Sequence, residues 1–344
     1  MQYRRQPVQR LLATALLLVV GWGLALLSAE ARRVRVATFN VEMGIGEPGS
    51  EKYEAQKMVL RRIDADIVAF QELRRASSNH WARLGEELNY PHRVWGKTGP
   101  LSGQMDLGFW SRFPVIDSAD VESPEGAREF ARFPLRIRVQ VPGAARPLTL
   151  WNLHHKAMFE PRDEFRRAVE AFRVAGDIAR HLKAHPDEME LVVLGDMNDD
   201  PARNVQTEFF TEPPPGLPSR YQLGPDIPFP LPYRPFPIAV YARAGPGFRP
   251  VPAFRQNSDH GSTHFYTNLR LDWIFASEPF WRHPDGPPVG EIYHSEWDQP
   301  EGGGLPKAGP RPPPDLSLKA SDHYPVFADL HMEDAGENAA DDSR

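Results

Sequence analysis

Cysteine is absent from the 344-residue chain. Its absence excludes disulfide bonds, thiolate zinc sites and a cysteine nucleophile, so any bound metal must be held by oxygen or imidazole. An excess of positive charge is also absent, because 46 Asp and Glu outweigh 40 Lys and Arg for a formal net charge of -6. This balance argues against a protein that coats nucleic acid through bulk positive charge, but it is compatible with a local basic groove.

The sequence does contain enough apolar material for a sizeable core. Apolar residues make up 41% of the chain, which includes 19 Phe and 8 Trp. Such a composition rules out wholesale disorder. A chain of this length suits one large α/β domain or two small ones, and we expect one.

Residues 1–31 are predicted to be an export segment. Arginines precede an uncharged stretch at residues 11–27, and Ala29 and Ala31 place small residues where a signal peptidase would read. We expect cleavage after Ala31 and a mature protein that is periplasmic or secreted. The alternative is an uncleaved membrane anchor, because the uncharged stretch is only slightly shorter than the roughly 20 residues that span a bilayer.

Short apolar runs alternate with helical patterns along the rest of the chain. Strands are predicted at residues 33–39, 67–70, 107–110, 135–141, 148–153, 191–194, 269–276 and 321–330. A helix is predicted at residues 51–63. A second helix is predicted to begin with Asp163 as its cap and to cover a sheet, because its apolar side chains recur at three- and four-residue steps.

Two segments, near residues 213–252 and 279–314, are rich in proline. Proline lacks the amide that a strand ladder requires, so we expect both segments to be surface insertions that supply no central strand. The acidic residues 333–344 are expected to form a disordered tail. Residues 32–332 then form the predicted catalytic domain.

Polar residues stand in or at the edge of several predicted strands. They are Asn40, Glu72, His154, Asp196 with Asn198, Asp272, and Asp322 with His323. Taken singly, each is typical of a turn or of the surface. Strands that lie side by side can gather their ends into one cleft, so the coincidence predicts a shared site.

The motifs that carry these residues resemble those of the endonuclease/exonuclease/phosphatase superfamily, which includes deoxyribonuclease, abasic-site endonuclease and neutral sphingomyelinase. The motifs lie, in the family's order, at residues 38–41, 70–73, 152–154, 195–198, 271–274 and 321–326. The resemblance covers about residues 34–330. It implies an α/β fold, a four-layer α-β-β-α sandwich of two mixed sheets flanked by helices.

The resemblance also implies a metal site. Glu72, with Asn40 and Asp322, would bind Mg²⁺ or Mn²⁺, since carboxylate and amide oxygens suit these hard cations. Asp196 would orient or deprotonate the attacking water, and Asn198 would hold a phosphate oxygen through its amide.

Three further roles follow from the same likeness. His323 would lie beside the scissile phosphate, and Asp272 would fix its tautomer and charge. His154 would contact phosphate or assist the leaving oxygen. Whether His323 or Asp196 removes the proton from water stays open.

Other features carry less information. A second Ser-Asp-His, at residues 258–260, lies in a proline-rich region and is predicted to be a loop. His155 and Lys156 fit either a phosphate contact or a solvated strand end. The family segment matched by residues 103–114 usually carries a basic or tyrosyl residue near its start. Here Gln104 and Asp106 stand instead, which leaves the substrate open.

The predicted function is therefore that of an exported metal-dependent phosphoesterase of the nuclease kind. The alternative within this chemistry is a phospholipid or sphingolipid phosphodiesterase. A basic groove would favour nucleic acid, whereas an exposed loop carrying Phe229, Tyr233 and Phe236 would favour a membrane surface. A non-catalytic extracytoplasmic binding protein is the alternative of another class. No obligate protein partner is evident, and membrane contact requires an uncleaved leader or a lipid substrate.

Overall fold

The computed structural model describes residues 32–101, 105–203, 207–234, 236, 241, 245–299 and 303–335. The predicted export segment and residues 336–344 of the predicted acidic tail lie outside these ranges. Among the helices within them, none is long and apolar enough to cross a membrane.

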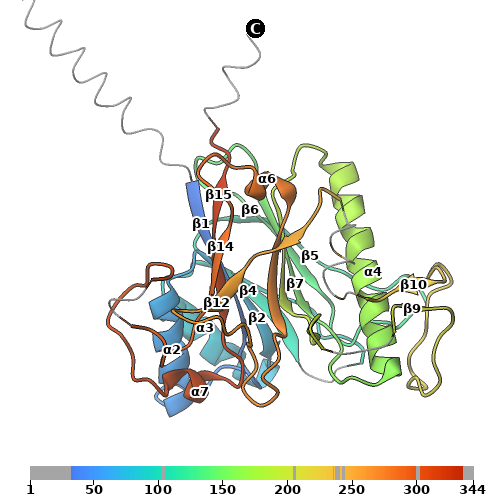
Figure 1. Cartoon of the computed structure of the whole chain (residues 1–344), viewed down its shortest axis with the longest axis horizontal. Coiled ribbons are helices and arrows are strands. Elements are labelled where there is room, and N and C mark those ends of the chain that lie inside the picture. The colour runs from blue at the N-terminus through green and yellow to red at the C-terminus, as the bar shows by residue number, and fades with distance from the viewer. Residues whose placement is uncertain are drawn as a thin grey trace, which may run out of the picture.

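Two mixed sheets form the centre of the molecule (Figure 1). The first has the order β12 (Ala253–Arg255), β14 (Val289–Ile292), β15 (Val326–Met332), β1 (Arg32–Asn40), β2 (Ile67–Leu73), β4 (Asp106–Ser111) and β3 (His92–Trp95). The second has the order β11 (Arg249–Pro250), β13 (Asp272–Ala276), β8 (Leu191–Asp196), β7 (Leu148–His154), β6 (Leu135–Val139) and β5 (Val115–Asp120). Strands β9 (Phe209–Phe210) and β10 (Leu231–Pro232) form a separate small ladder.

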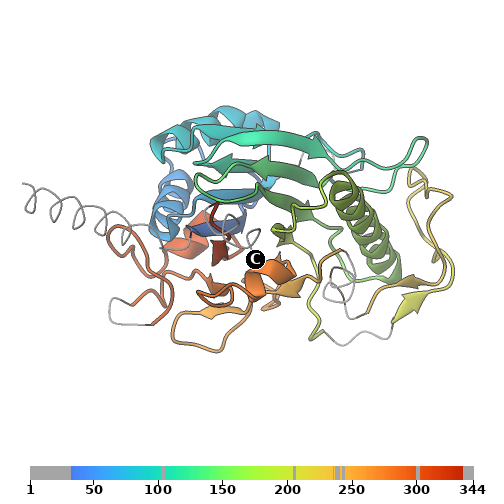
Figure 2. The same ribbon diagram turned by 90° about the horizontal axis from the view of Figure 1, so that it is seen from above.

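Helices cover the outer face of each sheet, so that four layers result (Figure 2). Helix α4 (Pro161–Ala184) packs on the second sheet, and α2 (Glu51–Ile63), α3 (Ser78–Glu87) and α7 (Leu316–Ala320) pack on the first. The short η1 (Arg75–Ser77) and α6 (Glu278–Trp281) lie in connections. A third apolar core fills the space between the sheets. The predicted four-layer sandwich is confirmed.

Because both faces of the sheets are covered, the central strands are buried along their whole length rather than at every second residue. All seven residues of β7 and all six of β8 are buried. Polar residues on these strands are accordingly paired across the core. Gln71 Nε2 on β2 donates to Asn152 Oδ1 on β7 at 2.7 Å, which links the two sheets.

Two local predictions are wrong. Helix α4 begins at Pro161 with Glu160 as its N-cap, so Asp163 lies in the first turn instead of capping it. Proline suits the first helical position because its missing amide has no helical partner there. Strand β14, from the second proline-rich segment, lies inside the first sheet between β12 and β15. Its four residues contain no proline, so its ladder is intact.

Candidate active site

The strand ends meet at one end of the sandwich. His154, Asp196 and Asp272 are register partners across β7, β8 and β13. Asn40 ends β1 in the first sheet, and His323 precedes β15, whose first residue pairs with Thr38 on β1. Chain direction and register therefore bring these side chains together from both sheets.

The Asn40 amide connects the two sheets at this end. Its Nδ2 donates to Asp196 Oδ2 at 3.0 Å and to Glu72 Oε1 at 3.2 Å, and it lies 3.5 Å from His323 Nε2. Asn40 is fully buried and Asp196 nearly so. A buried network of this kind has a single arrangement, because each broken bond would leave a polar atom unpaired.

His323 and Asp272 form the predicted pair. His323 Nδ1 lies 2.8 Å from Asp272 Oδ2, and Nε2 lies 3.9 Å from Asp196 Oδ2. Burial alone would lower the pKa of His323, but the carboxylates of Asp272 and Asp196 outweigh it and raise that pKa. The ring is therefore held as an imidazolium with Nε2 facing the site.

Asp196 and His154 are shifted in the direction of their neutral forms. Burial raises the pKa of Asp196 to about 7. Burial, followed by the Arg132 guanidinium, lowers the pKa of His154 well below its ordinary value. His154 Nε2 lies 3.4 Å from Asp196 Oδ2. Within the described residues, His154 Nδ1 and Asp272 Oδ1 are buried without a hydrogen-bond partner.

The backbone is strained where it presents two of these residues. Glu72 has φ 61° at an irregularity in the β2–β4 ladder, and Asn198 has φ 52°. Left-handed conformations are costly for residues other than glycine and cluster at functional sites. Gly195, next to Asp196 on β8, has φ 141°, and a Cβ there would meet Leu153 O at 2.0 Å. Glycine thus lets β7 and β8 approach closely beside Asp196.

Glu72 and Asn40 have oxygen atoms that fit a hard cation. In the described part of the chain, the Glu72 carboxylate accepts hydrogen bonds from Asn40 Nδ2 and Met43 N only. A carboxylate has about four acceptor positions, so two are free. Asn40 Oδ1 accepts from Glu42 N at 3.0 Å and keeps a second lone pair. This donor set suits Mg²⁺ or Mn²⁺ with several retained waters.

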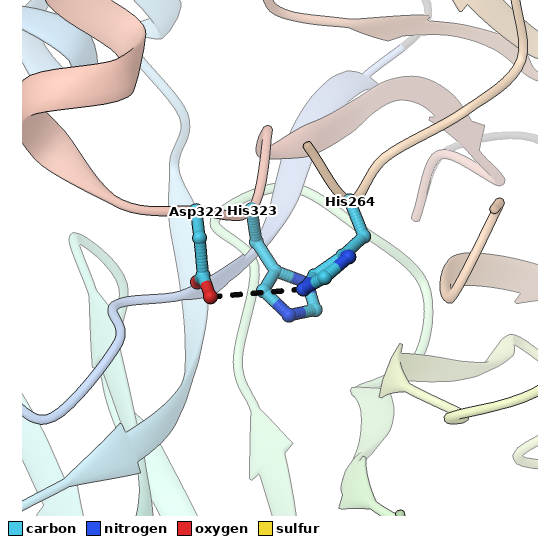
Figure 3. Close-up of side chains that lie close together, drawn as sticks. All are labelled: His264, Asp322 and His323. Atoms are coloured by element: carbon cyan, nitrogen blue, oxygen red, sulfur yellow. Dashed lines mark ion pairs between the residues drawn. The ribbon is translucent and has the colours of Figure 1, made fainter. Parts of the chain in front are cut away.

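Two predicted residues have other partners. Asn198 Nδ2 donates to His155 O at 3.0 Å, so one amide hydrogen is already used. Asp322 does not contact Asn40 or Glu72 among the described hydrogen bonds. Its Oδ2 lies 3.6 Å from His264 Nε2 instead (Figure 3). The roles of Asn198 and Asp322 remain predictions.

His264 is a site residue that the sequence reasoning missed. It forms an isolated backbone bridge to His323, and the two rings lie 4.7 Å apart at 70°. Figure 3 shows its ring beside the Asp322 carboxylate and the His323 ring. The only signal in the sequence was its place between the 258–260 loop and the predicted strand that carries Asp272.

Arg132 is a second missed residue. Its Nη1 donates to His155 O at 3.1 Å, whereas its Nε is buried without a partner in the described chain. Burial lowers its pKa, and the charges of Glu170, Glu72 and Asp196 oppose that shift. The guanidinium is therefore within electrostatic reach of the site. It brings a positive charge to the site from the β5–β6 connection rather than from the segment at residues 103–114.

The remaining candidates are structural. His155 is buried between Glu170 and Tyr241, and Lys156 pairs with Asp163. Asp106 accepts a hydrogen bond from Trp95 and pairs with Arg75. Gln104 lies outside the described residues. Residues 258–260 form the predicted loop.

Known structures with this architecture come from several organisms. An endonuclease/exonuclease/phosphatase from Bacteroides vulgatus is 16% identical with a TM-score of 0.51, over 88% of this chain and 100% of that chain. The human nocturnin catalytic domain is 14% identical with a TM-score of 0.52, over 87% and 94%. Sphingomyelinase C from Streptomyces griseocarneus is 14% identical with a TM-score of 0.53, over 87% and 99%. At these identities the likeness shows the fold.

A search of curated protein sequences finds no match. The sequence profile of the Endonuclease/Exonuclease/phosphatase family matches residues 37–323, from β1 to the His323 motif. The match thus includes the motifs at the ends of β1 and β2 in the first sheet. It also includes those at 152–154, 195–198 and 271–274 in the second sheet. The chain belongs to the Endonuclease/Exonuclease/phosphatase family, whose members are phosphoesterase hydrolases.

Proposed function

We propose that the protein is an exported phosphodiesterase of the nuclease kind that depends on Mg²⁺ or Mn²⁺. The observation that carries the proposal is the Asn40 amide, which bridges Glu72 and Asp196 beside the His323–Asp272 pair. The Glu72 carboxylate, the Asp196 carboxylate and the charged His323 ring all lie around this amide, which supports the proposal. Metal-assisted hydrolysis of a phosphodiester uses oxygen ligands for a cation, a base for water and a group that stabilises charge on the phosphate.

In the proposed mechanism Glu72 and Asn40 would hold the cation, and Asp322 would be a further carboxylate for it. When bound, the cation supplies charge that neutralises the phosphate oxygens. Asp196 takes a proton from water as the water oxygen attacks phosphorus. Its burial supports this role, because a pKa of about 7 suits a base at neutral pH.

His323 is proposed to donate from Nε2 to a phosphate oxygen. Because Asp272 and Asp196 keep the ring charged, it is a poorer proton acceptor than Asp196. The bond from phosphorus to the leaving oxygen then breaks, and that oxygen takes the proton that Asp196 received from water. His154, 3.4 Å from Asp196, is the residue proposed to assist it.

The test is a substrate panel. Purified protein is incubated with plasmid DNA, RNA, sphingomyelin vesicles and soluble phosphate monoesters, with Mg²⁺, Mn²⁺ or a chelator. We expect cleavage of nucleic acid that the chelator abolishes. Metal binding without turnover of any diester or monoester would instead support the non-catalytic binding protein. Mass spectrometry of the exported protein tests cleavage after Ala31.

A lipid phosphodiesterase is the second candidate, supported by exposed aromatic side chains beside the site. Phe265 and Tyr266, next to His264, are 48% and 75% exposed. In contrast, Tyr233 and Phe236 are fully buried, so Phe229, 39% exposed, is the one of the three aromatics of that predicted membrane loop that solvent can reach. Exposed aromatics can insert into a lipid interface or stack on bases. If Phe265→Ala/Tyr266→Ala impairs hydrolysis of vesicles but not of a soluble diester, the lipid substrate is favoured.

A further inference from the structure

A second cluster of possible metal ligands lies at the opposite end of the sandwich. There β15 ends and β8 begins, and Glu333 N donates to Glu190 Oε1 at 2.9 Å. The short helix α6 lies at this end, away from α7 (Figure 1). A cavity of about 260 Å³ is lined there by residues that include Glu190, His283 and His331. The site described above contains none of these residues.

Three side chains converge at this cavity. His283, Asp285 and His331 each offer a ligand atom within 4.8 Å of the other two. His283 Nδ1 lies 3.7 Å from Asp285 Oδ2, and the two imidazole rings stack with centroids 5.6 Å apart. His283 and Asp285 lie in the connection from α6 to β14, whereas His331 lies on β15. The cluster thus joins a loop to the sheet.

Two buried atoms beside the cluster lack partners. Glu190 is only 4% exposed, and its Oε2 has no hydrogen-bond partner within the described chain. His331 Nδ1 is buried and unpartnered as well. Buried polar atoms of native proteins are normally satisfied by protein, water or an ion. Two buried polar atoms without a partner, in residues that line one cavity, therefore point to a missing polar partner or cation.

The nearby positive charges have other partners and do not fill this role. Arg146 Nη1 pairs with Glu333 Oε2 at 2.7 Å, and Arg282 Nε pairs with Glu278 Oε1 at 2.9 Å. Both arginines line the cavity. The carboxylates of Glu190 and Asp285 therefore remain free to meet a cation.

We propose that His283, Asp285 and His331 bind a zinc-class transition-metal ion. Two imidazoles and a carboxylate suit Zn²⁺ and not Mg²⁺, which prefers oxygen ligands. Bonds of about 2.0–2.1 Å place tetrahedral ligand atoms about 3.3 Å apart, so small side-chain rotations close the cluster. Water takes the fourth position, with Glu190 Oε2 as its acceptor. The ion would fasten the α6–β14 connection to β15 and to the start of β8, and thereby join the two sheets.

The experiment measures metal binding without reference to catalysis. Zn²⁺ is titrated into the protein against a chromophoric chelator, and Co²⁺ is added separately to record the visible absorption of a tetrahedral site. Both titrations use a Glu72→Gln background, which removes the main carboxylate proposed for the active-site cation. The variants described next distinguish this ion from one bound by His264, Asp322 and His323 at the active-site end. We expect one tight zinc ion and a tetrahedral cobalt spectrum.

Variants then locate the ion. Loss of a carboxylate or carbonyl that orients a metal ligand costs about 10- to 100-fold in affinity. We expect such a loss in Glu190→Gln and a loss of at least about 100-fold in His331→Gln and Asp285→Asn. Asp285 is exposed, so its variant remains informative even if His331→Gln folds poorly. His260→Gln, in an exposed loop, is the matched histidine control and should bind as the parent does.

Two results would overturn the proposal. One is no tight zinc binding by the Glu72→Gln protein. The other is zinc binding that survives both His331→Gln and Asp285→Asn. Neither result depends on phosphodiesterase activity, so a failure of the proposed function would leave this test intact.

Discussion

The two ends of the sandwich differ in how their buried polar side chains are hydrogen-bonded. At the active-site end, Asn40 donates to Asp196 and His323 pairs with Asp272, although His154 Nδ1 and Asp272 Oδ1 are unpartnered in the described chain. At the other end, the Glu190 and His331 side chains each keep an unpartnered buried atom, and the side chains of His283, Asp285 and His331 lie close together. Direct side-chain hydrogen bonds hold the first arrangement together, whereas none is present among the three clustered side chains of the second within the described residues. A catalytic site must hold its side chains in place before the substrate binds, so that they can stabilise the transition state. A metal site can instead reach its final arrangement when the ion binds.

The ends also differ in the elements that build them. The active-site residues lie at the ends of neighbouring strands and are fixed by register. The ligands at the opposite end combine a strand with the α6–β14 connection. Changes at the active-site end should therefore affect turnover with little effect on folding. Changes at the opposite end should affect metal binding and stability with little effect on turnover.

The largest effects are expected when the proposed machinery is removed. Glu72→Ala should abolish metal-dependent turnover, because the main carboxylate ligand is lost. His323→Ala should lower kcat by about 10³-fold or more, within the range of lost acid–base and charge stabilisation, but leave metal binding largely intact. Steady-state kinetics and metal titration measure both. His331→Gln, at the other end, is the control for turnover. Full metal-dependent activity in Glu72→Ala would contradict the ligand assignment.

The next effect concerns the orientation and charge of His323. Asp272→Asn should lower kcat by about 10²- to 10³-fold, because the remaining amide no longer fixes the charged tautomer. Since Asp272 raises the pKa of His323, its removal should move the alkaline limb of the pH–rate profile to lower pH. A purely structural role for Asp272 would reduce activity equally at every pH. The full pH–rate profile of each protein therefore decides between the two.

Much of the active-site end could be predicted, because short segments of the sequence indicate where its strands end. Apolar runs that end in polar residues located the strands, and the motif order implied the sandwich. Asn40, Glu72, His154, Asp196, Asp272 and His323 lie together at one end of the sandwich, and their catalytic and metal-binding roles stay predictions. The strand period can be recognised within each short segment, and the order of the motifs can be read directly along the sequence. The prediction therefore depended on few long-range assumptions.

The missed residues lie in connections between strands, where apolar residues follow neither the helical nor the strand period. His264 reaches His323 through an isolated bridge, and Arg132 lies in the β5–β6 connection. Strand β14 was overlooked because prolines surround it, although its own residues pair normally. His283 and His331 meet only through the tertiary fold. Histidine spacing along a helix, which is the usual sequence sign of a zinc site, does not detect them.

Acid sensitivity should arise in part away from the active site. His181 on α4 packs edge-on against Trp151 and lies 3.4 Å from Thr149 Oγ1 near the start of β7. Burial lowers its pKa to about 4, against an unfolded value of about 6.5. Glu188 opposes this shift, and its other charged neighbours, Arg136, His185 and Arg138, add to it.

The sign of the resulting stability change follows from the direction of this shift. A depressed histidine pKa contributes stability above pH 6.5 that is lost as pH falls from about 6.5 to 4, up to on the order of 3 kcal/mol. His181→Gln should flatten this dependence. Urea unfolding between pH 4 and 8, with a chelator present to remove any metal contribution, measures it. An unchanged slope in His181→Gln would show that another group dominates acid unfolding.

The smallest effect is expected for Arg132, whose positive charge is predicted to act on the substrate at the active-site end. Its guanidinium has a buried, unpartnered Nε and lies within electrostatic reach of Glu72 and Asp196. If it contacts the substrate phosphate, Arg132→Gln should lower kcat/KM by about 10- to 100-fold, the usual value of a charged hydrogen bond, and Arg132→Lys should recover part of that loss. Arg136→Gln is the matched control, because Arg136 pairs with Asp117 and Asp177 on the second sheet and α4. An equal loss in both variants would mean that Arg132 acts through the fold. A loss confined to Arg132 would show that a connection, rather than a strand end, supplies the positive charge of the site.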